Sequence, residues 1–343
     1  MKHRTFMWFI LPSLAAMILF IALPIFSVFT QSFFVSHGQV LIETENCGPF
    51  GCKKEVTVDV DATKQLNMEN PLGKFNGFKT YTNRNHLAFQ EVGIAWNSSA
   101  SIFSFLKSLL NLPFYKALLF TITYTFCVTP FVIVIGLFIA LGVNSLPTIL
   151  KGPTIFMSLL PMIVTPLIGA LILYWMIDAE GIIGATLQKV FNDSSLSLKA
   201  SPSLTWIMLM VYGVWHSAPF SFIVFYAGLQ TVPEDTLEAA MIDGANRWQR
   251  IWYIVVPYMM PLVVFITLIQ LMDNFRVFEP IVGFSAQANA TSLSWIIYND
   301  LRGQDVQLFG SASTTSMLTI LGVGFLLIPI LVRTWRDFNT KTV

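Results

Sequence analysis

The sequence predicts an all-α membrane protein with six transmembrane helices and a small external subdomain between the first two. Of its 343 residues, 55% are hydrophobic and 11% are charged, less than half of the roughly 25% usual in soluble domains. The hydrophobic residues come in runs long enough to cross a bilayer as helices. One hydrophilic segment, residues 31–113, holds 14 charged side chains and separates the first run from the others.

This composition excludes several classes of protein. A net charge of +1 offers no basic surface for nucleic acid. A soluble enzyme or a disulfide-rich secreted domain would need a more polar surface or more cysteines. A transmembrane β-barrel would show short alternating segments in place of long apolar runs.

The first expected span, Phe6–Phe29, contains no charged residue over 24 positions. It is too long for the apolar core of a signal peptide, so we expect it to be retained. Its prolines, like those of the other spans, are tolerated where neighbouring helices satisfy the freed carbonyls. The other expected spans are Leu118–Val143, Thr154–Met176, Leu204–Gln230, Met259–Phe278 and Ser313–Val332.

Lysine and arginine in the tails and short loops predict the orientation. Cytoplasmic positions usually carry the excess of these residues, which favours cytoplasmic N- and C-termini. The residues then inside are Lys2, Arg4, Lys151, Arg247, Arg250, Arg333, Arg336 and Lys341, against Lys189, Lys199 and Arg302 outside. The chain divides into residues 1–30 (tail and first helix), 31–113 (external), 114–332 (transmembrane core) and 333–343 (cytoplasmic tail).

The external segment is expected to form a few short strands. Lys53–Asp61 alternates valines with polar residues, the period of a half-buried strand. Cys47 and Cys52 flank a Gly-Pro pair, so a local disulfide is expected outside the cytoplasm, with two free thiols as the alternative. No further metal ligands lie nearby, so no metal site is expected.

The segment 231–257 carries six charged residues and lies in the cytoplasm in this orientation. Its acidic first part favours a short helix. Gly244 permits a left-handed turn that ends this helix. Asn246–Tyr253 then continues as an amphipathic helix. A helix-turn-helix of this kind is suited to insertion into a groove on another protein.

This segment resembles the EAA loop of permease subunits in ATP-binding-cassette importers. The matching residues are Glu238, Ala239, Ala240, Asp243, Gly244, Ala245, Trp248, Ile254 and Pro257. Leu112–Asn144 also resembles the core-entry span of that family. The similarity covers about Phe75–Val332 plus the first span, and it is greatest to the maltose-type carbohydrate permeases.

The resemblance implies the type I ABC importer permease fold in a bacterial inner membrane. It implies a second homologous permease, two ATPase subunits and an external solute-binding protein as partners, beside the lipid bilayer. ATP and Mg²⁺ would be bound by the ATPase subunits, and this chain would bind no cofactor and catalyse no reaction. The absence of a G-x-x-x-x-G-K-[ST] motif agrees with this role. The coupling residues would be Glu238, Ala239, Ala240, Asp243, Gly244, Ala245, Arg247 and Trp248.

In carbohydrate permeases of this type the substrate lies between the helices before and after the EAA loop. Here the preceding helix offers Gly213, Trp215, Ser217 and Phe220, and the following helix offers Gln270, Asp273 and Asn274. These last three share one helix face by their spacing, and polar groups inside a bilayer are usually functional. As alternatives, Asp273 pairs with Arg276, Asn274 only bridges helices, or Arg276 pairs with Glu279.

The expected cargo is a sugar, oligosaccharide or polyol. Residues Gly283–Leu293 lack the paired glycines usual in sugar permeases. Another polar solute, such as a polyamine, phosphodiester or osmolyte, is therefore the alternative cargo. A secondary transporter is less well supported because no inverted repeat is visible. A membrane enzyme would need a nucleophile, base or metal cluster, and the four scattered histidines do not supply one.

Overall fold

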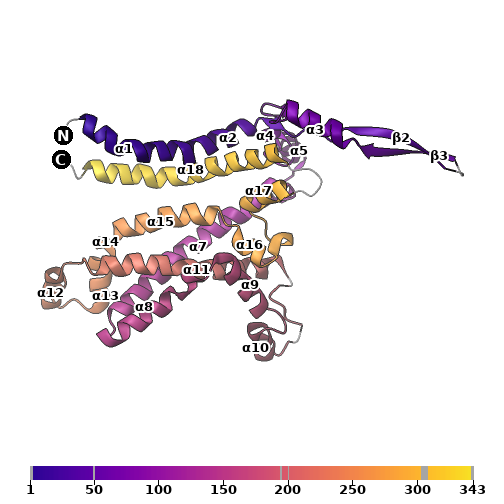
Figure 1. Cartoon of the computed structure of the whole chain (residues 1–343). Coiled ribbons are helices and arrows are strands. Elements are labelled where there is room, and N and C mark those ends of the chain that lie inside the picture. Colours follow the sequence, from indigo (N-terminus) through magenta and orange to yellow (C-terminus); the bar gives the residue numbers. More distant parts are fainter. Residues whose placement is uncertain (1–2, 49–50, 194, 200, 303–307, 341–343) are drawn as a thin grey trace. The chain divides into compact units, whose positions relative to one another are not determined.

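The computed structural model describes residues 3–48, 51–193, 195–199, 201–302 and 308–340 (Figure 1). The chain divides into two compact units. The first joins Met1–Lys116 to Ile296–Ile320, and the second joins Ala117–Trp295 to Leu321–Val343.

The first unit contains one apolar helix, two small antiparallel sheets and several short helices. The helix Phe6–Gln31 includes a π-helical turn and buries none of its length within the structure. The elements that begin in this unit are α1 (His3–Met17), η1 (Ile18–Ala22), α2 (Leu23–Gln31), β1 (Phe34–Val35), β2 (Leu41–Gly48), β3 (Gly51–Val58), α3 (Val60–Glu69), β4 (Lys74–Phe75), α4 (Lys79–Thr82), α5 (Phe89–Ser98), α6 (Ile102–Leu109), α7 (Pro113–Asn144) and α18 (Phe309–Thr340).

The strand expected over Lys53–Asp61 is present as β3, which pairs with β2 as a hairpin (Figure 1). It ends earlier than expected because Asp59 caps the next helix. The Asp59 carboxylate accepts hydrogen bonds from the backbone N–H groups of Asp61 and Ala62, both at 3.0 Å. Such a cap favours a helix start over a continued strand.

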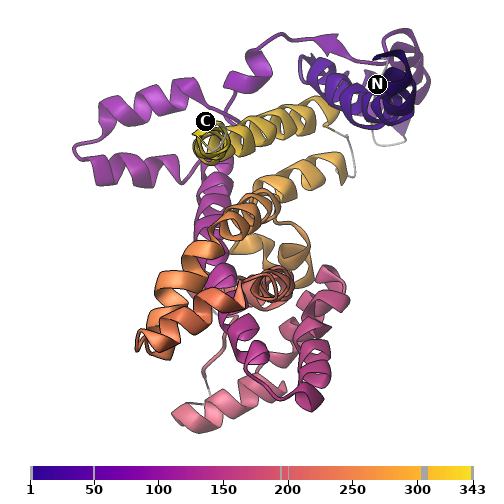
Figure 2. The same cartoon turned by 90° about the vertical axis from the view of Figure 1, so that its left-hand side faces the viewer.

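The helices α5 and α6 form a second, helical hairpin in this unit (Figure 2). The rings of Trp96 and Phe105 meet edge to face across it, with centroids 5.2 Å apart. Ser101 begins α6 with a capping box completed by Ser104. Aromatic packing and a satisfied helix start together stabilise this hairpin.

A buried polar cluster ties the external segment to the start of α18. His86 is fully buried, and its Nε2 lies 3.2 Å from the carbonyl oxygen of Ser311. The Ser311 hydroxyl donates to the Asp300 carboxylate at 2.7 Å. Buried polar groups need such partners, so the cluster fixes the loop that follows α4 against α18.

Among the residues that the structure describes, the second unit contains helices joined by loops and no strand. Besides most of α7 and the later part of α18, it contains α8 (Thr148–Ile163), α9 (Pro166–Met176), α10 (Ile182–Phe191), α11 (Pro202–Leu229), α12 (Glu234–Ile242), α13 (Arg247–Arg250), η2 (Ile251–Val255), α14 (Val256–Tyr258), α15 (Met260–Phe275), α16 (Glu279–Gly283), η3 (Ala286–Ala288) and the start of α17 (Leu293–Arg302).

Small residues allow the long helices of this unit to approach closely. A Cβ on Gly136 of α7 would lie 2.5 Å from the Cβ of Ser221 on α11. A Cβ on Gly283 of α16 would lie 2.6 Å from that of Ala170 on α9. Small residues at crossings are the common solution where helices pack in a membrane.

Within the described ranges, four helices are long and apolar enough to cross a membrane, and up to six spans result if each of two bent pairs is counted as one. The expected second, fourth and sixth spans correspond to α7, α11 and α18. The expected third span, Thr154–Met176, is instead divided into α8 and α9, which are bent by 94°. Val164 is extended between them, and Thr165 is also non-helical, with ψ of 141°. Thr165 precedes Pro166, and a residue before a proline disfavours helical backbone.

The expected fifth span, Met259–Phe278, is also shorter than the sequence suggested. It is α15, which ends at Phe275. The preceding helix Arg247–Tyr258 meets α15 at a bend of 64°. Pro257 and Pro261 flank this bend, and each lacks the backbone N–H that a continuous helix requires.

Candidate functional site

A polar cavity of about 570 Å³ lies within the second unit, between α7, the α8–α9 break, α11, α15 and α16. Its lining combines aromatic, amide, hydroxyl and charged side chains. They are Tyr124, Met162, Pro166, Tyr212, Gly213, His216, Ser217, Phe220, Ile269, Gln270, Asp273, Asn274, Arg276, Val277, Glu279 and Pro280.

Two amides of α15 lie side by side at this cavity. Gln270 and Asn274 are only 4% and 5% exposed. Asn274 Nδ2 donates to Gln270 Oε1 at 3.3 Å and to Thr129 Oγ1 on α7 at 3.1 Å. Asn274 therefore bridges α15 and α7, the contact named in the alternative interpretation, and it also lines the cavity. Its Oδ1 and the Gln270 amide nitrogen have no protein partner among the hydrogen bonds of the described residues and are available to a solute.

Two side chains of α11 contact backbone carbonyl oxygens at the break between α8 and α9. The Tyr212 hydroxyl donates to the carbonyl oxygen of Pro166 at 2.6 Å. His216 Nε2 lies 3.3 Å from the carbonyl oxygen of Val164. Backbone groups freed inside a membrane need such partners, so Tyr212 and His216 have a structural role besides lining the cavity.

The charged residues of the cavity are unevenly paired. Arg276 Nη2 donates to Asp273 Oδ1 at 2.8 Å, and Arg276 Nε donates to the Met272 carbonyl oxygen at 3.3 Å. The alternative in which Asp273 pairs with Arg276 is thus confirmed. Arg276 does not pair with Glu279, and no ion pair engages the Glu279 carboxylate in the part of the chain that the structure describes.

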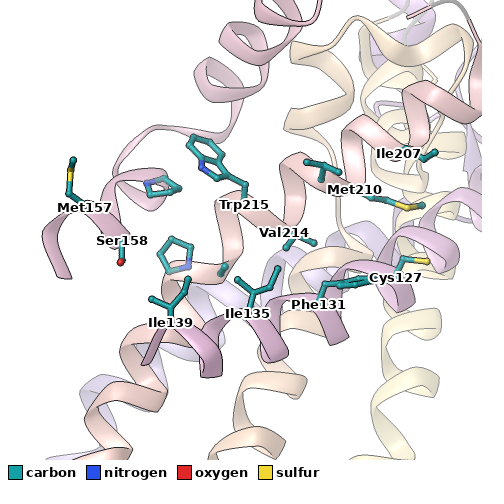
Figure 3. A pocket seen from close by; sticks show the side chains of 14 residues that line it. Cys127, Phe131, Ile135, Ile139, Met157, Ser158, Ile207, Met210, Val214 and Trp215 are labelled. Carbon is teal, nitrogen blue, oxygen red and sulfur yellow. The ribbon is translucent and has the colours of Figure 1, made fainter. Parts of the chain in front are cut away.

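The structure brings together six of the seven side chains that the sequence suggested for substrate contact. They are Gly213, Ser217, Phe220, Gln270, Asp273 and Asn274. Trp215 does not line this cavity. It lies in a separate apolar cavity of about 650 Å³ with Cys127, Phe131, Met157 and others (Figure 3). Trp215 is two residues from Gly213, about 200° around the helix, so it occupies a different face of α11.

Sequence reasoning missed Tyr124 and Tyr212, which line the cavity from α7 and α11. A Cβ on Gly213 would overlap the Tyr124 hydroxyl, so this glycine makes room for the tyrosine. The signal was available for Tyr212, which shares a helix face with His216 by its spacing of four. For Tyr124 no local signal existed, because its position depends on how α7 crosses α11.

The loop between α11 and α15 consists of two helical pieces around a glycine, as the sequence predicted. α12 ends in a Schellman motif, in which Ala245 N–H donates to the Ala240 carbonyl at 2.9 Å and Gly244 N–H to the Met241 carbonyl at 3.1 Å. Gly244 has φ of +82°. Asn246 and Gln249 form a capping box at the start of α13. These backbone groups of the turn therefore find their hydrogen-bond partners within the loop, and the turn forms without a partner protein.

Large apolar side chains of this loop are exposed beside its charged ones. Ile242 is 87% exposed and Trp248 is 64% exposed. A Cβ on Gly244 would meet nothing within 4 Å. The proposed coupling residues Glu238, Ala239, Asp243, Gly244, Arg247 and Trp248 are exposed, and Ala240 and Ala245 are half-buried. An exposed apolar patch around a preformed turn is typical of a protein–protein contact.

No cluster of three or more potential metal ligands occurs among the described residues. The described cysteine Cys127 is a free thiol in the apolar cavity. Cys47 and Cys52 occupy opposite positions in the β2–β3 register, but their side chains lie outside the part that the structure describes.

The model of one protein family, the binding-protein-dependent transport system inner membrane component, matches residues 100–337. A relative from Mycobacterium tuberculosis, the trehalose transport system permease protein SugA, is 32% identical over 140 residues, which are 40% of this chain. The match spans 45% of the length of SugA. The trehalose/maltose transport system permease protein MalF of Thermococcus litoralis is 26% identical over 239 residues, covering 68% of this chain and 79% of that protein.

The fold also matches a solved structure. A chain of a bacterial ABC transporter involved in the import of the acidic polysaccharide alginate superposes with a TM-score of 0.58 at 20% identity. The superposition covers 80% of this chain and 95% of that chain.

Proposed function

The chain belongs to the family of binding-protein-dependent transport system inner membrane components, and we propose that it is the permease subunit of an ATP-driven importer for a sugar, oligosaccharide or polyol. It is a multi-pass transport component of the inner membrane. It works without catalysing a reaction itself.

The observation that carries this proposal is the loop around Gly244. Its turn is internally satisfied, its apolar side chains are exposed, and space is open above the glycine. A preformed helical loop of this kind fits a groove in a partner subunit at little cost in conformational entropy. In the proposed importer this groove belongs to the ATPase, and ATPase closure moves the loop and thereby the helices.

The proposed partners follow from this role. They are a second, homologous permease, two ATPase subunits and an external solute-binding protein. The ATPase subunits supply the ATP and Mg²⁺ sites. The proposed orientation has both chain ends in the cytoplasm, which leaves residues 31–113 outside to meet the binding protein, with Cys47 and Cys52 joined as a disulfide in the β2–β3 hairpin.

The polar cavity is the proposed cargo site. Sugar recognition needs amides or carboxylates for hydroxyl groups and an aromatic face for the ring, and this cavity offers Gln270, Asn274 and Phe220 in one place. The names of SugA and MalF point to the same class of cargo. A polar solute of another kind is the second candidate, supported by the departure at Gly283–Leu293 from the sugar-permease pattern.

Purification of the tagged full chain from its native membrane tests the assignment. A second permease, an ATPase and a solute-binding protein should co-purify, and the binding protein should then be screened against sugars and other polar solutes. A chain recovered from mild detergent without any ATPase, and able to take up solute by itself, would contradict the proposal.

A further inference from the structure

We propose that the polar cavity selects an uncharged, hydroxyl-rich solute, and that the carboxylate of Glu279 excludes anions from it. This inference rests on the proposed function, because it takes the cavity to be the cargo site. It adds a statement about the charge of the cargo, which cannot be inferred from the fold. The same fold occurs in an importer of the acidic polysaccharide alginate.

The first argument is the charge of the lining. The guanidinium of Arg276 is held by the Asp273 carboxylate at 2.8 Å. His216 directs Nε2 at the Val164 carbonyl, and an ordinary histidine is mostly neutral at pH 7. Glu279 has no cationic partner within the described residues. The cavity therefore retains a net negative charge carried by Glu279.

The second argument is the balance of donors and acceptors. Asn274 uses its amide nitrogen on Thr129 and Gln270 and leaves its oxygen free. The Tyr212 hydroxyl donates its hydrogen bond to the Pro166 carbonyl oxygen, so toward a solute it can only accept. With Nε2 of His216 protonated, its Nδ1 is also an acceptor. These acceptors and the Glu279 carboxylate stand beside donors such as the Gln270 amide nitrogen, so the lining offers both kinds of hydrogen-bonding group.

A solute with many hydroxyl groups complements such a lining, because each hydroxyl can both donate and accept a hydrogen bond. A phosphate or carboxylate would bring a second negative charge close to the Glu279 carboxylate. Like charges held close together repel each other. The phosphodiester alternative is therefore disfavoured, whereas a sugar or polyol fits.

Charged thiol reagents test this property directly. Ser217 of the cavity is replaced by cysteine in a chain whose free Cys127 is replaced by serine, within membrane vesicles that hold the whole complex. The rates of labelling by a cationic methanethiosulfonate and its anionic analogue are compared. The matched control is Ser98→Cys, at an exposed position of α5 outside the cavity.

The cationic-to-anionic rate ratio at position 217 should exceed that at position 98 by about tenfold, the scale expected for one nearby charge. Glu279→Gln should bring the ratio down to the control value, and Glu279→Asp should preserve it. Equal ratios at positions 217 and 98, or a ratio unaffected by Glu279→Gln, would overturn the inference.

Uptake by the same vesicles separates this inference from the proposed function. Import of an uncharged sugar, with anionic analogues excluded until Glu279 is replaced by glutamine, is the expected result. ATP-driven import of an anionic solute by the unaltered chain would overturn the charge inference and leave the importer assignment intact. A lack of any ATP-driven uptake would instead count against the importer assignment.

Discussion

The side-chain amide of Asn274 on α15 donates a hydrogen bond to Oγ1 of Thr129 on α7, at 3.1 Å. Both residues are buried, and Thr129 is not part of the cavity lining. Substitutions at these two residues can therefore distinguish the packing of the helices, to which both contribute, from the proposed binding of the cargo, to which only Asn274 would contribute.

Asn274→Ala should weaken uptake by raising the apparent KM, because it removes both the helix bridge and a cavity amide. Thr129→Val removes the bridge alone and should retain the KM. Each change leaves a buried polar group without its partner and should cost about 1–3 kcal/mol of stability. Uptake kinetics and thermal melting of both variants check this, and equal effects on KM would assign Asn274 a purely structural role.

Gly244→Asp should abolish ATP-driven uptake and its coupling to ATP hydrolysis while membrane insertion stays normal. The residue has φ of +82°, where a side chain is strained, and its Cβ would point into open space that the proposed ATPase groove occupies. Gly142→Ala is the matched control, since an added Cβ there also meets nothing within 4 Å. Uptake that survives Gly244→Asp would remove the coupling role from this loop.

Gly213→Ala should reduce uptake, because the new methyl group would overlap the Tyr124 hydroxyl and push the buried ring into the cavity. The double variant with Tyr124→Phe removes the overlapping oxygen atom and should recover part of the activity. Uptake rates of the single and double variants give the comparison. An absence of any recovery would mean that Gly213 acts by some route other than the Tyr124 contact.

Acidification should destabilise the external segment through His86. Burial lowers the pKa of His86 below its ordinary 6.5, and the Ser311 carbonyl and the Asp300 charge offset this only in part. The unfolded chain then binds a proton at a pH where the folded protein does not, so stability falls as pH drops below 6.5 toward the folded-state pKa. Burial also raises the pKa of Asp300 above 3.8, an effect of the opposite sign in a more acidic range.

Melting temperatures at pH 7.5 and pH 5.5 measure the His86 effect. The unaltered protein should lose more thermal stability between these two values than His86→Gln, which cannot titrate but keeps a hydrogen-bonding side chain. Identical losses in the two proteins would show that another group governs the acid sensitivity.

Cys47 and Cys52 should form a disulfide when the chain is made in its native membrane. Directly opposite residues of an antiparallel pair place their Cα atoms at a separation that a disulfide can bridge. Mass spectrometry of unreduced peptides should find the two residues linked and Cys127 alkylated. Alkylation of all three cysteines before reduction would contradict the pairing.

The long helices and the loop around Gly244 could be predicted from the sequence because their signals are local. Uninterrupted apolar runs mark α7, α11 and α18, and the glycine after an acidic helix marks the turn. The break at Val164 could not be located in this way. Residues on both of its sides are equally apolar, and the freed carbonyls are satisfied by Tyr212 and His216 from a helix that lies far away in sequence.

The cavity was predictable on α15 because polar residues are conspicuous in an apolar helix. On α11 the sequence indicates proximity to the loop but no preferred face, and Trp215 was therefore included although it does not line this cavity. The spacing of Gly213, Ser217 and Phe220, which share one face, would have excluded it. The pairing of Arg276 with Asp273 and not with Glu279 depends on the end of α15 at Phe275, which no local pattern marks.

The helices α13, η2, α14 and α15 follow one another directly, so the Gly244 loop and the cavity lie at opposite ends of this run of helices. Only Met259 separates the helix Arg247–Tyr258 from α15, and the two helices meet at a bend of 64°. The Tyr258 hydroxyl donates a hydrogen bond to the Thr231 carbonyl oxygen at 2.8 Å, which ties this bend to the residues that follow α11. Gln270 lies ten residues beyond Met260, about 15 Å along α15. In the proposed importer, a movement of the Gly244 loop would therefore reach the cavity amides through this bend and α15.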